Sequence, residues 1–261
     1  MRAVGAAWRV GFAHVFVYRA EIAIQLISAA IVAGLNGSLW TAAVRGRDGI
    51  AGVPSSEMIT YVVVAWVAVS FFASRVNEEI GRRVRDGQIA TDLLHPTSLL
   101  TMAWARDFGR ACACFLVHTL PLFAACAFVF PVEMPRHPWT WALWVLSLVL
   151  AHATNFGISF LVGLAALPLH SVTGLTHLKG TVVSVFSGAL IPLELFGPAL
   201  RPFLMALPFQ ALAYTPASIF LERDVSIVSL LGTQFAWAAV LWTAGALAWR
   251  GAARTLTVQG G

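Results

Sequence analysis

Residues 77–96 read NEEIGRRVRDGQIATDLLHP, a dense block of charge between two long apolar runs. Glu78 precedes Arg82 by four residues, and Glu79 precedes Arg83 by the same spacing. An acid four residues before a base supports a helix, because the two side chains meet on one helical face. The stretch therefore predicts a charged helix directly after an apolar run.

A helix stop follows these pairs. Gly87 stands where a residue in the left-handed conformation commonly ends a helix, and residues 88–95 can form a second short helix before Pro96. An ordinary solvated loop is the alternative, but a connector without a role could be much shorter. We interpret residues 77–96 as a docking elbow. The side chains expected to meet a partner are Glu78, Glu79, Arg82, Arg83, Arg85, Asp86, Gly87, Asp92, Leu93 and Leu94.

The composition places the chain in a lipid bilayer. Of its 261 residues, 59% are hydrophobic and 11% are charged, whereas a soluble domain carries about 25% charged residues. The 17 basic residues lie between apolar runs and do not form one basic face, so nucleic-acid binding is not expected. Three cysteines lie in or beside one apolar run, and we interpret them as small buried hydrophobic residues.

The apolar runs predict six membrane-spanning helices, since about 20 apolar residues cross roughly 30 Å of hydrocarbon. The predicted spans are 22–44, 58–74, 111–130, 139–167, 180–191 and 225–249. Residues 2–18 predict a helix in the membrane interface, because a stripe of large apolar residues runs along it away from Arg2 and Arg9. Residues 1–261 are thus predicted to form one all-α integral membrane domain, with the elbow between the second and third spans.

The segment between the fifth and sixth spans, residues 192–216, carries five prolines and cannot be one straight helix. We expect short helices that enter and leave one leaflet, which is tolerated where protein or a water-filled cavity covers the backbone. An outer gate is predicted at Pro192, Glu194, Gly197 and Pro198, with the sharp turn at Gly197. Three roles for Glu194 stay open, namely substrate contact, a pair with Arg201, or exposure to headgroup water.

The basic residues also predict an orientation. In this arrangement twelve arginine or lysine residues fall on the side of the elbow and both termini, and five fall on the opposite side. By the positive-inside rule, both termini and the elbow are expected to be cytoplasmic. The proline-rich segment would then face outward.

Motifs for catalysis or nucleotide binding are absent from the sequence. The single lysine, Lys179, lies in HLKGT, which lacks the spacing of a phosphate-binding loop, and no cofactor or metal is expected in this chain. Within the spans, His152, Asn155 and Ser159 are candidate helix-packing or path residues. Packing is favoured, because small residues recur every fourth position around Asn155 and Ser159.

Two other classes of function are alternatives. A self-sufficient carrier or channel would use His118, His152 and Asn155 inside the membrane. An intramembrane enzyme is disfavoured, since no pair of nucleophile and base is visible. Neither class accounts for the ordered charge of the elbow.

The order of these elements resembles the ABC-2 type permease subunits of bacterial ABC exporters. The resemblance is carried by RRVRDGQIATDLLHP, IPLELFGPAL, LPFQALAYTPASIFL and the C-terminal RTLTVQGG, and it covers essentially the whole chain. It implies a multi-pass export permease of the bacterial cytoplasmic membrane that forms a dimer, with a copy of itself or, preferentially, with a second, similar permease. It also implies a separate ATPase subunit that holds ATP and Mg²⁺ and on which the elbow would dock as a coupling helix.

Overall fold

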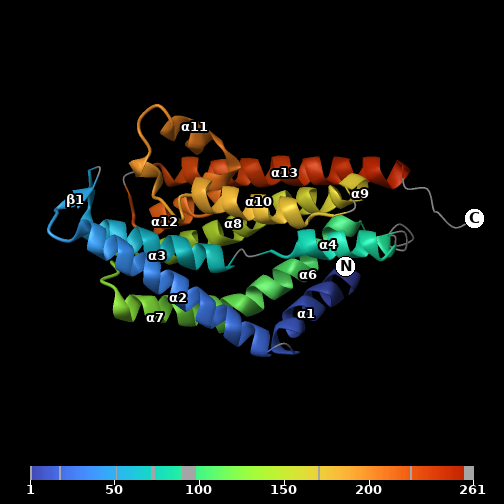
Figure 1. Ribbon diagram of the computed structural model, residues 1–261, viewed down its shortest axis with the longest axis horizontal. Coiled ribbons are helices and arrows are strands. Elements are labelled where there is room, and N and C mark those ends of the chain that lie inside the picture. Colours follow the sequence, from blue (N-terminus) through green and yellow to red (C-terminus); the bar gives the residue numbers. More distant parts are fainter. Residues whose placement is uncertain are drawn as a thin grey trace, which may run out of the picture.

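The computed structural model describes residues 2–17, 19–50, 52–71, 74–89, 98–169, 171–223 and 225–255. Long helices run side by side, with the N-terminus of the chain and α4 at one end and β1 at the other (Figure 1). We call these the termini end and the hairpin end. In chain order the elements are α1 (Arg2–Val17), α2 (Arg19–Val44), β1 (Gly49–Ile50), β2 (Val53–Pro54), α3 (Ser55–Phe71), α4 (Val76–Arg85), α6 (Leu99–Cys114), the π-helical turn η1 (Phe115–Thr119), α7 (Leu120–Val129), α8 (Pro138–Leu164), α9 (Ala166–Leu169), α10 (Thr173–Phe186), the 3-10 turn η2 (Leu193–Leu195), α11 (Arg201–Ala206), the 3-10 turn η3 (Pro208–Ala211), α12 (Tyr214–Phe220) and α13 (Ile227–Thr255).

Within the described parts of the chain, five helices are long and apolar enough to cross a membrane. They lie in Ile22–Val44, Ser55–Arg85, Leu99–Val129, Pro138–Leu169 and Ile227–Arg254. These helices support the prediction of an all-α membrane protein. The expected fifth span differs, because α10 begins at Thr173 and ends at Phe186, and such a 14-residue helix is only roughly 20 Å long. The sixth crossing therefore stays a prediction.

The helix of the expected third span is longer than residues 111–130. It begins at Leu99, where the Oγ of Ser98 accepts a hydrogen bond from the backbone N–H of Thr101 at 3.2 Å. The π-helical turn η1 interrupts it immediately before Pro121, whose nitrogen has no proton to donate to the preceding turn. The half-polar segment before residue 111 thus forms one helix with the apolar segment that follows it.

The backbones of α1 and α6 touch along their length (Figure 1). A Cβ atom on Gly11 would overlap the carbonyl oxygen of Arg106, and one on Gly109 would overlap the carbonyl oxygen of Trp8. Only glycine permits so close an approach of two helices. The buried residues of α1 are Ala7, Gly11 and Val15. The predicted stripe coincides in part with the packed face, because Val15 is buried, Val4, Trp8 and Phe12 are half-buried, and Phe16 is exposed. The interfacial position of α1 stays a prediction.

Residues 187–223 fold back into the half of the bundle near the hairpin end, and every residue of α12 is buried. The turn that starts this segment lies at Gly188, with φ of 84°. A further turn begins at the predicted position, Gly197, whose carbonyl oxygen accepts from the backbone N–H groups of Leu200 and Arg201. The hydroxyl of Tyr61 donates to the carbonyl oxygen of Gly188 at 3.0 Å. The segment is closed by a hydrogen bond of 3.0 Å from the N–H of Tyr214 to the carbonyl oxygen of Ser187. Its placement relative to a membrane stays a prediction.

Candidate functional site

The first part of the candidate site is α4, which is anchored by one apolar face. Asn77 and Ile80 are buried, and both lie so close to Gly163 of α8 that a Cβ there would be about 3 Å from each of them. The side-chain amide of Asn77 donates to the hydroxyl of Thr176 on α10 at 2.7 Å. The helix is therefore fixed to two others through a single face.

The opposite face of α4 is charged and open to solvent. Its exposed residues, all at positions predicted to meet a partner, are Glu78, Arg82, Arg85, Asp86 and Gly87. Gly87 has φ of 69°, so the predicted left-handed helix stop is confirmed. Within the described residues, however, Glu78 and Arg82 make no ion pair, in contrast to the prediction. Both side chains extend into solvent, where such a pair would contribute little.

Glu79 and Arg83 point toward α6 instead of solvent. The predicted pair between them is present at 3.2 Å, and the same carboxylate oxygen also accepts from Arg106 of α6. Glu79 therefore holds α4 to α6. Both Glu79 and Arg83 are half-buried, which removes them from the exposed face. The predicted contacts Asp92, Leu93 and Leu94 lie outside the described residues.

A polar groove of about 280 Å³ adjoins the exposed face of α4. One wall is formed by α4 and the other by the start of α10. The lining residues are Glu78, Gly81, Arg82, Arg85, Val172, Thr173, Thr176 and His177. The charged face of α4 and the groove together form a charged surface with a concave part.

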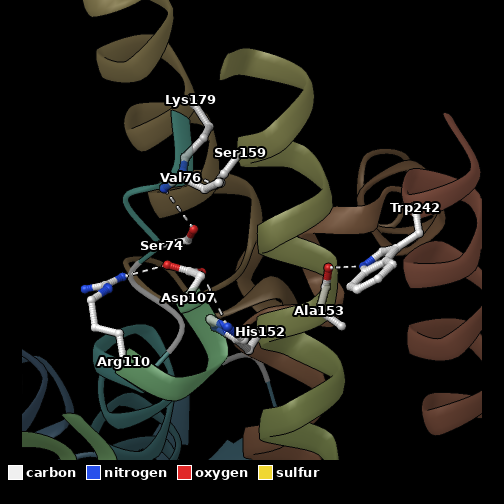
Figure 2. Close-up of polar contacts among 9 residues, drawn as sticks. All are labelled: Ser74, Val76, Asp107, Arg110, His152, Ala153, Ser159, Lys179 and Trp242. Carbon is white, nitrogen blue, oxygen red and sulfur yellow. Dashed lines mark hydrogen bonds and ion pairs between the residues drawn. The ribbon is translucent and has the colours of Figure 1, made fainter. Parts of the chain in front are cut away.

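The second part of the site is a buried polar cluster between α6, α8 and α10 (Figure 2). Asp107 of α6 accepts from Arg110 at 3.1 Å, and its other carboxylate oxygen lies 3.5 Å from Nε2 of His152. Neither ring nitrogen of His152 has a hydrogen-bond partner in the described part of the chain, and its side chain is 0% exposed. The ring packs against that of Trp104, with centroids 5.1 Å apart.

Lys179 reaches from α10 to α8, where its Nζ donates to the hydroxyl of Ser159 at 2.7 Å (Figure 2). On another side of α8, the indole N–H of Trp242 in α13 donates to the carbonyl oxygen of Ala153 at 3.0 Å. The predicted residues His152, Asn155 and Ser159 are all buried on α8. These contacts favour the packing interpretation. His118 has other surroundings, since it lines a hollow between α2, α3 and the helix that begins at Leu99.

The third part lies at the hairpin end and was not foreseen from the sequence. Arg223, which follows α12, pairs with Glu57 at 2.6 Å and also with Glu194. Its guanidinium carbon lies 5.0 Å from the ring centre of Tyr61. Burial lowers the pKa of Arg223, but the carboxylates of Glu194 and Glu57 outweigh it and hold this pKa above its ordinary value. Of the roles left open for Glu194, the structure selects an ion pair, with Arg223 in place of Arg201.

Glu222 binds the N-terminus of α8. Its carboxylate accepts from the backbone N–H of His137 at 2.9 Å and from the hydroxyl of Thr140 at 2.6 Å. The hydrogen bond from Thr140, followed by that from His137, lowers the pKa of Glu222 to about 2. A carboxylate from a distant part of the chain therefore serves as the cap that a helix normally takes from its own first residues.

The four residues of the predicted outer gate do not share one environment. Pro192 is buried, and Glu194 is engaged by Arg223. Gly197 and Pro198 are exposed at the start of the turn that leads to α11. Only the second pair lies on the surface at the hairpin end.

A model of a protein family described as "ABC-2 family transporter protein" matches residues 38–260 of the chain. The matched region contains α4, the buried polar cluster and the residues that surround Arg223, and it leaves α1 outside. The searches of curated proteins and of solved structures give no match.

Proposed function

Because this chain belongs to the ABC-2 transporter family, we propose that it is the membrane permease subunit of an exporter whose ATP is hydrolysed by a separate ATPase subunit. The observation that carries this proposal is the two-sided character of α4. One face is fixed to α8 and α10, while Glu78, Arg82 and Arg85 extend from the other. A helix held rigidly on one side and charged on the other can receive a partner without being displaced by it.

The ATPase would bind at the exposed face of α4 and the adjoining groove, on the cytoplasmic side of the bacterial inner membrane. This orientation rests on the excess of basic residues at the termini end. The resemblance to exporter permeases further supports a dimer, preferentially with a second, similar permease. Glu79 is assigned a different task from the exposed charged residues of α4, because it connects that helix to Arg106 of α6, and Arg83 pairs with Glu79 within α4.

Charge reversal on the exposed face tests the docking role. Arg82→Glu combined with Arg85→Glu should leave folding unchanged, since both side chains are exposed, but should present the wrong charge to the ATPase. Arg45→Glu with Arg47→Glu is the matched control, because it reverses two exposed charges at the hairpin end. The measurement is co-purification of the ATPase in mild detergent, together with its nucleotide hydrolysis. Loss of the ATPase with the first variant alone supports docking, and equal retention by both variants refutes it.

Single cysteines test the orientation independently. Cysteine replaces Arg47 or Arg85 in a background without the three native cysteines. An impermeant maleimide applied to whole cells should label position 47 and spare position 85. The reverse pattern would invert the proposed topology, even if the chain still bound its ATPase.

A further inference from the structure

A large recess near the termini end carries an excess of positive charge. It has a volume of about 960 Å³ and is enclosed by α1, α2, α4 and α6. Its lining contains five arginines, at positions 75, 82, 83, 106 and 110, against three acids, at positions 78, 79 and 107. Two positive charges therefore remain in excess, with His14 counted as neutral.

The acids of this recess engage some of the arginines. Glu79 pairs with Arg83 and Arg106, and Asp107 pairs with Arg110. Arg82 is exposed and makes no ion pair with any residue that the structure describes. The recess thus presents one cationic group, Arg82, that no carboxylate in the described part of the chain engages in an ion pair.

A second, mostly apolar hollow adjoins the first recess. It has a volume of about 370 Å³ and lies between α2, α3 and the helix that begins at Leu99. The two recesses share the lining residues Gln25, Arg75, Arg110 and Cys114. Beyond these, the hollow is lined largely by apolar side chains of helices long enough to span a membrane. The lining therefore changes from arginine-rich to apolar across one shared boundary.

We propose that the two recesses together bind one anionic glycerophospholipid from the leaflet at the termini end. Its phosphate would lie among the arginines, which form charge-assisted hydrogen bonds to phosphate oxygens. An acyl chain would occupy the apolar hollow. A soluble phosphate uses only the first recess and leaves the apolar hollow without a function. The inference does not depend on the ATPase, because it concerns binding by this chain alone.

Native mass spectrometry of the purified protein, released from detergent, tests the proposal. Phosphatidylglycerol should form a one-to-one adduct at least about tenfold more readily than phosphatidylcholine, because only the first lipid carries a net negative charge. Inorganic phosphate at equal concentration should not displace the lipid. Equal binding of the two lipids, or complete displacement by phosphate, would overturn the assignment.

Two pairs of variants locate the site. Arg75→Gln with Arg82→Gln should weaken the adduct about tenfold, whereas Arg2→Gln with Arg9→Gln removes two exposed charges of α1 outside the recess and should change it little. Val32→Trp should fill the hollow and weaken lipid binding. Ile31→Trp, at an exposed neighbouring position that does not line the hollow, is its control. If each variant and its control weaken binding equally, the lipid binds elsewhere and the proposal fails.

Discussion

Arg223 and Glu194 form a buried ion pair at the hairpin end, with side chains 11% and 10% exposed, although 29 residues separate them in the chain. Arg223 also pairs with Glu57, at the start of α3. One guanidinium thus connects the folded-back segment to a long helix, and two carboxylates in a largely apolar environment depend on it.

Replacing Arg223 with methionine should destabilise the protein by about 3 kcal/mol, because it leaves two carboxylates without a cation in a poorly solvated site. Thermal unfolding in detergent measures the loss. The double variant Arg223→Met with Glu194→Leu should lose less than the single variant, since it also removes one of the isolated charges. A single variant as stable as the wild type would show that the pair contributes nothing.

The carboxylate of Glu222 should give stability a specific dependence on pH. Its pKa is lowered from 4.5 to about 2 in the folded protein, so its contribution is complete above pH 4.5 and is lost as the pH falls toward 2. The difference in melting temperature between the wild type and Glu222→Gln should therefore shrink as the pH falls from 4.5 toward 2. Asp48→Asn, which neutralises an exposed carboxylate, is the control. A difference that persists unchanged to pH 2.5 would contradict this account.

Gly11→Ala should separate α1 from α6, because the added Cβ would overlap the carbonyl oxygen of Arg106. Overpacking of this kind costs about 2 kcal/mol. Gly5→Ala lies on the same helix with nothing within 4 Å of the added atom, and it should be neutral or stabilising by about 0.5 kcal/mol. The melting temperature should therefore fall for Gly11→Ala and stay the same or rise for Gly5→Ala. Equal values would mean that the contact between the two helices adapts freely.

Gly188→Ala should be more harmful than Gly197→Ala. Gly188 has φ of 84°, and a Cβ there would lie 2.5 Å from the hydroxyl oxygen of Tyr61. The left-handed conformation alone costs alanine about 1–2 kcal/mol. A Cβ on Gly197 would meet nothing within 4 Å. Thermal unfolding of both variants measures this difference, and a larger loss at position 197 would contradict this account.

Features set by near neighbours in the chain could be predicted. The helix of the elbow, its stop at Gly87 and the pair between Glu79 and Arg83 all depend on residues within one or two turns. The apolar runs, including the one that forms α3, were also recognisable, because length and composition decide whether a segment suits a membrane.

Features that depend on which helix faces lie together could not be predicted. In a bilayer, apolar side chains suit lipid as well as protein, so periodicity did not show that α1 packs closely on α6 at Gly11. Arg223, which pairs with Glu194, lies 29 residues away in a sequence stretch that looked solvent-exposed. α10 likewise begins earlier than expected, because residues 173–179 contain no proline and their polar side chains include Lys179, which pairs with Ser159.

A single turn of α4 is attached to three separate helices. Asn77 is bonded to α10, Glu79 to α6, and Ile80 rests on α8. A force applied to the exposed face of α4 therefore cannot be absorbed by that helix alone, because its attachments are short and diverge in three directions. It would be transmitted to α6, α8 and α10 at the same time, so that α4 couples its exposed face to three helices of the membrane domain.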